Sequence, residues 1–270
     1  MLLSQRNAHP RDKDIQFFEE GHKYVILPDS TSTYTSVTTW NHSHFPKFDA
    51  DNIIKNMMKS KGWKPGHKYW GLTQEEIKAM WSSNTQASAG TALHYEIECF
   101  MNSGLYTNAD LYKKNETCKN TNTQPEWQYF LNFLKDYPDL KPYRSEWTIY
   151  NEDLKIAGSI DMVYENPDGT LSIYDWKRCK NITRINTFNK FALNPVINHF
   201  PDSNFWHYAL QLNTYKAILE DKYDVKVNEL FLVRLHPEAE EQNYELIQIP
   251  ILNKEITELF LERKKEIKTI

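Results

Sequence analysis

The stretch KIAGSIDMVYENPDGTLSIYDWK, residues 155–177, carries the strongest fold signal of the sequence, because two β-prone runs flank a tight turn. The turn NPDG (residues 166–169) has Pro and Asp at the central positions of a type I turn. Its Gly suits the left-handed position that lets such a turn close a hairpin. With Pro, Asp and Gly as the loop, Asp161 lies directly opposite Asp175. The stretch therefore predicts an antiparallel hairpin in which two carboxylates face each other.

The two facing carboxylates require a positive partner. Directly opposed residues hold their Cβ atoms roughly 4.5 to 5.5 Å apart, and two carboxylates that close resist ionising together. Lys177 lies two residues after Asp175 and therefore on the same face. A hard divalent cation between Asp161 and Asp175, with Lys177 near the reacting oxygen, explains all three placements. The alternative is a surface hairpin with a charged outer face.

The elements around the hairpin predict an α/β or α+β core with a mixed central β-sheet flanked by helices. Alternating or β-branched runs predict strands at 144–150, 155–165, 171–177, 229–236 and 244–250. Apolar spacing predicts helices at 49–58, 85–102, 126–137 and 205–220, and a last one after Asn253. We expect residues 1–84 to form an N-terminal lobe that binds substrate, residues 85–270 to form the core, and the polar residues 104–124 to be an exposed connection.

Several classes of protein are excluded by glycine and cysteine usage. No two of the eight glycines are closer than four residues, so no GxGxxG turn exists, and the one P-loop-like spacing lacks the Lys and Ser/Thr that must follow. We therefore expect no nucleotide cofactor. Three scattered cysteines are too few for a disulfide framework or a four-cysteine zinc or iron–sulfur site. With no signal peptide and no membrane span, the sequence predicts a cytoplasmic protein, or a nuclear one in a eukaryote, that is not secreted.

Positive charge is concentrated in two runs, although the net charge of the 270-residue chain is −4. Residues 52–74 carry five lysines, three tryptophans or tyrosines and no acid, and residues 176–200 carry five basic residues and no acid. Cations neutralise phosphates, and aromatic rings offer stacking surfaces for unpaired bases. The runs therefore favour a nucleic-acid groove over two solvated loops, with candidate contacts at Lys61, Lys64, Lys68, Arg178, Lys180 and Arg184.

Five short motifs occur in order along the chain. They are GTALH at 90–94, Glu146, GSID at 158–161, DWK at 175–177 and QLNTY at 211–215. Together they resemble the PD-(D/E)xK nuclease superfamily, specifically its RecB-like exonuclease branch, over about half of the chain. Because the cysteines needed for the iron–sulfur cluster of some members are absent, the chain resembles the cluster-free, phage or organellar type.

The resemblance implies a restriction-endonuclease-like core and a role for each motif. It implies metal ligation by His94, Asp161 and Asp175 with the carbonyl of Trp176 completing the shell. Lys177 would orient or deprotonate the attacking water and stabilise charge on the phosphate. Glu146 would be a ligand or would support one, and Gln211 with Tyr215 would position the nucleic acid. Glu98 could orient the imidazole of His94. Since imidazole suits Mn²⁺ better than Mg²⁺, we expect Mn²⁺ to be at least as effective.

The sequence thus predicts a deoxyribonuclease that uses one or two Mg²⁺ or Mn²⁺ ions, most simply an exonuclease acting on DNA ends or single strands. A structure-specific or restriction-like endonuclease is an alternative, as is an inactive nuclease-like protein that only binds nucleic acid. RNA is not excluded as a substrate. His42 and His44 form an HxH pair with no further partner at metal-ligand spacing, so a surface loop is the favoured interpretation there.

Overall fold

The computed structural model describes residues 2–82, 85–103 and 124–269. The chain divides into two compact units, one comprising Met1–Pro46 with Leu93–Ile270 and the other Lys47–Ala92. The first 46 residues therefore pack with the core, and the division does not fall at residue 84. The predicted connection at 104–124 lies outside the described residues except for its last position.

The predicted hairpin is present with the predicted register. Its strands are β5 (Ile156–Glu165) and β6 (Leu171–Lys177), which pair antiparallel from Met162 opposite Tyr174 to the turn. Gly169 has φ of 81°, a left-handed conformation that only glycine adopts without strain. The turn chemistry and the alternation of the two runs are local properties, so the sequence alone determined this hairpin.

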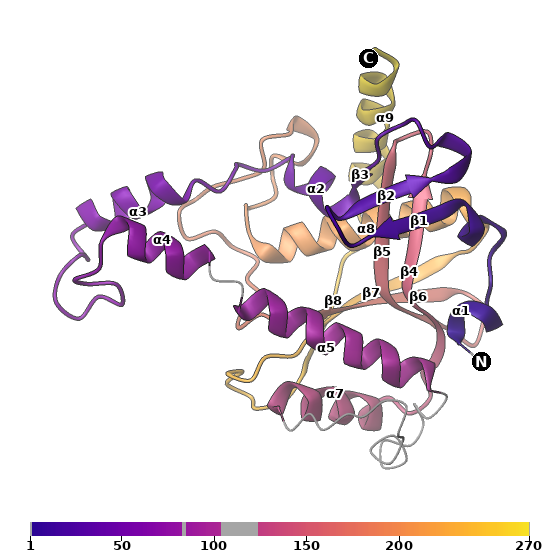
Figure 1. The fold of residues 1–270 in the computed structure, drawn as a ribbon, viewed down its shortest axis with the longest axis horizontal. Coiled ribbons are helices and arrows are strands. Elements are labelled where there is room, and N and C mark those ends of the chain that lie inside the picture. The colour runs from indigo at the N-terminus through magenta and orange to yellow at the C-terminus, as the bar shows by residue number, and fades with distance from the viewer. Residues whose placement is uncertain (1, 83–84, 104–123, 270) are drawn as a thin grey trace. The chain divides into compact units, whose positions relative to one another are not determined.

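Six strands form one mixed sheet, which confirms the predicted fold class (Figure 1). β5 pairs antiparallel with β4 on one side and β6 on the other, β6 pairs parallel with β7, and β7 pairs antiparallel with β8. A two-residue strand, β3, pairs parallel with the start of β5. The bounds of these further strands are β3 Thr35–Ser36, β4 Lys141–Asn151, β7 Val227–Arg234 and β8 Glu245–Gln248.

Helices cover both faces of the sheet and give two hydrophobic cores. One core joins the sheet to α2 (Val37–His42), α8 (Asn204–Lys222) and α9 (Asn253–Thr269). The other joins it to α7 (Pro125–Asp136) and to the part of α5 (Thr85–Asn102) from Leu93 onward. Alternate residues of β6 enter the two cores, so the charged residues at its end arise from a strand buried on both faces.

The N-terminal elements close one end of the sheet. α1 (Leu3–Arg6) precedes a two-stranded sheet of β1 (Ile15–Phe18) and β2 (Lys23–Ile26), the two strands that the β-prone runs in this region predict. The HxH pair is only partly in the expected surface loop, because His42 is an exposed helical residue and His44 lies in the turn that follows it. His42 ends α2, and His44 lies edge-on to Trp40 with ring centroids 4.9 Å apart and a buried Nε2.

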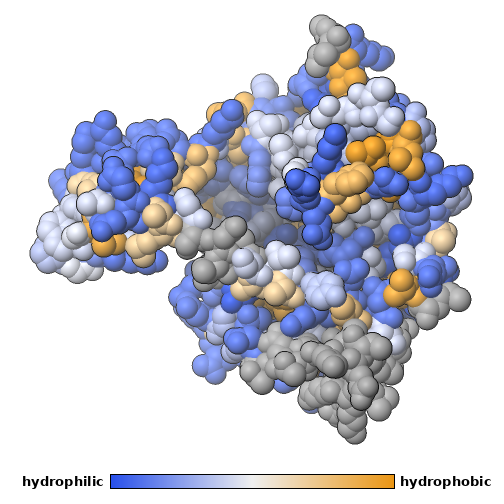
Figure 2. Space-filling view, viewed as in Figure 1, coloured by the Kyte–Doolittle hydropathy of each residue, from blue (hydrophilic) through white to orange (hydrophobic). Residues whose placement is uncertain are grey.

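The smaller unit is built from α3 (Ala50–Lys59) and α4 (Gln74–Ser82). Asp49 caps α3 by accepting a hydrogen bond from the backbone of residue 52, and Thr73 and Glu76 form a reciprocal capping box before α4. Hydrophilic side chains dominate the visible surface of this unit (Figure 2). No helix among the described residues is long and apolar enough to cross a membrane.

Candidate metal centre

Three neighbouring strands bring three carboxylates into one row. Glu146 and Asp161 lie between two paired positions of β4 and β5, Ser145 opposite Met162 and Trp147 opposite Ile160. Continuing the hairpin register one residue beyond the pair of Met162 and Tyr174 brings Asp161 opposite Asp175. Glu146 has φ of 43°, in the left-handed region that a glutamate rarely adopts. Such strain persists where surrounding structure enforces it and is concentrated at functional sites. The row is therefore a product of strand pairing together with one strained backbone position.

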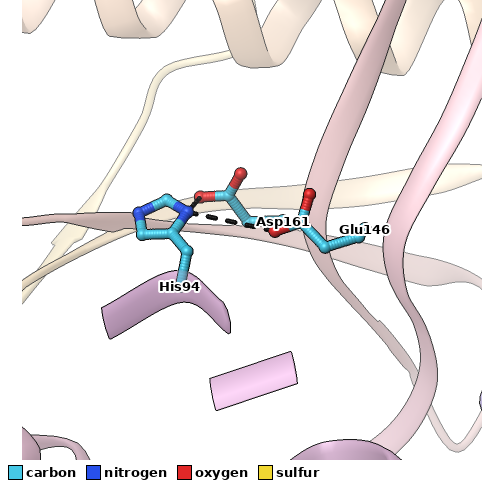
Figure 3. Close-up of side chains that lie close together, drawn as sticks. All are labelled: His94, Glu146 and Asp161. Atoms are coloured by element: carbon cyan, nitrogen blue, oxygen red, sulfur yellow. Dashed lines mark ion pairs between the residues drawn. The ribbon is translucent and has the colours of Figure 1, made fainter. Parts of the chain in front are cut away.

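His94 reaches the row from α5 (Figure 3). Its Nε2 lies 2.9 Å from the carbonyl oxygen of Trp176, while its Nδ1 lies 3.5 Å from Asp161 Oδ2 and 3.9 Å from Glu146 Oε1. A carbonyl oxygen only accepts hydrogen bonds, so Nε2 must carry the hydrogen. In the neutral imidazole the lone pair of Nδ1 then points to the carboxylates, which is the tautomer that a metal ligand needs.

The donor set suits a divalent cation. One ligand atom from each of His94, Glu146 and Asp161 lies within 4.8 Å of the others. Burial and the charge of Asp161 raise the pKa of Glu146 to about 8. The same two causes raise the pKa of Asp175 to about 6, against the opposing effect of Lys177. A cation among these groups would relieve the repulsion, and oxygen ligands with one imidazole suit Mg²⁺ or, better, Mn²⁺.

Lys177 is held as a cation beside this row. Its Nζ lies 2.5 Å from Asp175 Oδ2 and 4.6 Å from the centroid of the Tyr208 ring. Burial lowers the pKa of Lys177, but the charges of Asp175 and Asp161 outweigh it, and the net pKa is raised above the ordinary value. A lysine that keeps its proton stabilises negative charge and does not act as a base. Of the roles expected for Lys177, this arrangement favours stabilisation of charge on the phosphate over deprotonation of the attacking water.

Gln211 and Tyr215 lie one turn apart on α8, and the Gln211 amide donates a 3.2 Å hydrogen bond to the Tyr215 hydroxyl. The Tyr215 ring packs over Gly158, where an added Cβ would lie 2.8 Å from its Cε1 and 3.1 Å from Val37 Cγ2. Only glycine permits that approach. The glycine of GSID and the tyrosine of QLNTY are thus two sides of one contact.

The structure divides the predicted metal ligands into two groups. His94 and Asp161 lie together with Glu146, which was expected to be either a ligand or a residue that supports one. Asp175 is instead paired with Lys177. The Trp176 backbone contacts two of these residues. Its carbonyl oxygen accepts from His94 Nε2, and its N–H donates to Asp161 Oδ2 at 2.9 Å. It occupies the place expected for Glu98 as the partner of His94.

The predicted nucleic-acid contacts differ in their surroundings. Lys61, Lys64 and Lys68 are exposed, and none of them forms an ion pair with another residue of the described ranges. In the second run the acids come from distant parts of the chain. Arg178 binds Glu126 at 2.8 Å and Lys180 binds Glu238 at 3.0 Å, so the charges of both are compensated. The guanidinium of Arg184 lies 4.0 Å above the Phe205 ring.

Three features near the site were missed from the sequence. Ser159 donates to Glu146 Oε2 at 3.0 Å. Tyr208 contacts Lys177, and its spacing to Gln211 and Tyr215 on one face of α8 was a usable signal. The third feature is a cluster around His207. Its Nε2 lies 2.8 Å from Asp202 Oδ1, and its ring centroid lies 5.1 Å from that of His42. No local sequence pattern indicates this cluster.

Comparisons with known proteins give only distant likenesses. No family model matches the chain, and no curated protein sequence matches it. A solved structure of a "Putative exonuclease" from Eubacterium rectale is 12% identical with a TM-score of 0.43, and the match covers 87% of this chain and 79% of that one. The structure of SSO0001 is 15% identical with a TM-score of 0.33, covering 87% and 76%. Likenesses this remote say nothing of what the chain does.

Proposed function

We propose that this protein is a divalent-metal-dependent deoxyribonuclease, and specifically an exonuclease that acts on DNA ends or single strands. The observation that carries the proposal is the row of Glu146, Asp161 and Asp175 across three strands, with His94 at one side and Lys177 at the other. The five motifs quoted from the sequence supply the resemblance to RecB-like exonucleases, and contacts between their residues support it, since His94 lies beside Asp161 and the Tyr215 ring packs over Gly158.

Each residue of the site would have a distinct role. His94, Glu146 and Asp161 would hold Mg²⁺ or Mn²⁺, and the ion when bound would lower the pKa of a water and polarise the phosphate. Asp175 fixes the Lys177 ammonium, which would stabilise the negative charge that develops on the phosphate oxygens. Gln211, whose amide donates a hydrogen bond to the Tyr215 hydroxyl, would orient the substrate strand.

The test is cleavage of single-stranded and duplex DNA, labelled separately at the 5′ and 3′ ends, with EDTA, Mg²⁺ or Mn²⁺. We expect metal-dependent release of mononucleotides or short products from one labelled end, and no cleavage in EDTA. Cleavage with either metal should fall at least about 1,000-fold in Asp161→Asn, because a ligand of the ion is lost. Absence of cleavage on every substrate would overturn the proposal.

A matched control comes from the same hairpin. Asp168 lies in the turn, where its carboxylate accepts from the backbone and hydroxyl of Thr170. Asp168→Asn makes the same chemical change as Asp161→Asn at a position outside the row, so we expect it to cleave like the wild type. Equal activity of Asp161→Asn and Asp168→Asn would refute the assignment of the site even if the protein is a nuclease.

A further inference from the structure

The loop between β6 and α8 (residues 178–203, the β6–α8 loop) exposes large apolar side chains. Phe188 is 81% exposed, Ile185 71% and Leu193 67%, and Phe188 is the most exposed large apolar residue in the described part of the chain. Single exposed apolar residues are ordinary on protein surfaces. Three within nine residues, in a loop that leaves the active-site strand, indicate a surface that another molecule covers.

The tip of this loop is built to hold Phe188 outward. The Asn186 side chain accepts from the backbone N–H of Phe188 at 2.8 Å and donates to the carbonyl of Asp202 at 2.6 Å. Asn189 is left-handed, with φ of 54°, and its N–H donates to the carbonyl of Asn186 at 3.0 Å. The carbonyl of Lys190 accepts from Asp202 N at 2.9 Å. These hydrogen bonds fix both ends of the turn that carries Phe188, so the exposure of the Phe188 ring follows from the fold.

The positive charge near Phe188 indicates what kind of molecule would cover this surface. No acid occurs between residues 176 and 200. Arg178 and Lys180 are compensated by Glu126 and Glu238, but neither Arg184 nor Lys190 forms an ion pair with any residue of ranges 2–82, 85–103 and 124–269. Exposed rings beside uncompensated cations suit a polyanion with flat apolar faces, which describes unpaired nucleic acid.

The loop is fixed to the helix that carries Gln211 and Tyr215. The Trp206 indole N–H donates to the Arg184 carbonyl at 3.1 Å, and Asn204 bonds the loop backbone through Asn181 and Thr183. Trp206 precedes Gln211 by five residues, which is about 8 Å of helix rise. A strand bound on the loop near Arg184 would therefore lie within a few nucleotides of Gln211.

We infer that the β6–α8 loop binds the unpaired DNA strand next to the cleavage site, with a base stacked on Phe188 and phosphates on Arg184 and Lys190. This inference rests on the proposed function and adds to it the residues that would select single strands. A paired base has no free face for Phe188, whereas an unpaired base does. The loop would thus favour single strands or frayed ends over intact duplex.

The experiment measures binding without cleavage. Fluorescence anisotropy with a labelled oligonucleotide in EDTA compares wild type, Phe188→Ser and Phe188→Trp on single-stranded and blunt duplex DNA. We expect Phe188→Ser to weaken single-strand binding about tenfold, equivalent to about 1.4 kcal/mol. Phe188→Trp should retain it, and duplex binding should change less than twofold in both. Leu261→Ser, which removes an exposed apolar residue of α9, is the matched control and should bind like wild type.

Two results would overturn the inference. One is single-strand binding by Phe188→Ser that equals that of wild type. The other is a change of self-association in Phe188→Ser, measured by sedimentation, that accounts for any loss of binding, because the surface would then be an interface between copies of the chain. The outcome is independent of catalysis. If wild type binds through Phe188 but never cleaves with Mn²⁺, the proposed nuclease fails and the binding surface stands.

Discussion

Replacing Glu146 by glutamine should stabilise the metal-free protein at high pH. Burial and the charge of Asp161 raise the pKa of Glu146 from 4.5 to about 8, so its ionised form is disfavoured in the folded state. For a carboxylate whose pKa is raised on folding, stability is lost as the pH rises from the unfolded pKa through the folded one. Glutamine resembles the protonated acid in shape and carries no charge. The variant should therefore match wild type near pH 5 and exceed it at pH 9.

The size of the effect follows from the same shift. A pKa rise of this size is worth at most about 5 kcal/mol, at about 1.4 kcal/mol for each pH unit. The Glu146 side chain keeps 32% of its surface exposed, and Ser159 donates to its carboxylate, so solvent and this hydrogen bond reduce the penalty. We expect about 1 to 2 kcal/mol of stabilisation at pH 9, which for a chain of this size raises Tm by about 2 to 8 °C.

The assay is calorimetry in EDTA at pH 5, 7 and 9 on wild type, Glu146→Gln and Glu258→Gln, an exposed glutamate of α9 that controls for the loss of one charge. The stabilisation by Glu146→Gln should grow with pH, and that by Glu258→Gln should not. Saturating Mn²⁺ should reverse the order, because wild type gains a ligand that the variant lacks. A pH-independent difference, or a variant less stable than wild type at pH 9 in EDTA, would refute the electrostatic reasoning.

Three further changes test the surroundings of the row. Gly158→Ala forces the Tyr215 ring to move, so we expect the free energy of unfolding to fall by about 1 to 3 kcal/mol and cleavage to be reduced. Chemical denaturation measures this change, and unchanged stability would show that the ring moves freely. His94→Ala removes the nitrogen ligand, so the ratio of Mn²⁺-supported to Mg²⁺-supported cleavage should fall at least threefold, and an unchanged ratio would contradict ligation. Lys177→Met removes the ammonium next to Asp175, so kcat should fall at least about 100-fold. The affinity for Mn²⁺, measured by calorimetric titration, should change little. Equal losses of kcat and of Mn²⁺ affinity would assign Lys177 to metal binding.

The sequence determined the hairpin because its signals are local. A turn with Pro, Asp and Gly in the correct order fixes the register, and the register alone places Asp161 opposite Asp175. Helix boundaries set by capping side chains, such as Asp49 and Thr73, were likewise predictable. In each case the residues that decide the geometry lie within a few positions of one another.

The remaining features depend on residues far apart in the chain. Glu146 joins the candidate metal ligands through pairing of β4 with β5 and through a left-handed backbone, which no local pattern indicates. Asp175 pairs with Lys177, which its two-residue spacing placed on the same face, and does not join His94, Glu146 and Asp161. The acid-free run after Lys177 acquires the carboxylate of Glu126 from α7. Linear charge counts miss such partners because folding supplies them.

We propose that His94, Glu146 and Asp161 together hold one divalent cation. The decisive measurement is Mn²⁺ binding followed by electron paramagnetic resonance at pH 8 in wild type, Asp161→Asn and the hairpin control Asp168→Asn. We expect at least one bound ion in wild type and in Asp168→Asn, with affinity for that ion reduced at least tenfold in Asp161→Asn. Equal Mn²⁺ binding by all three proteins would contradict it.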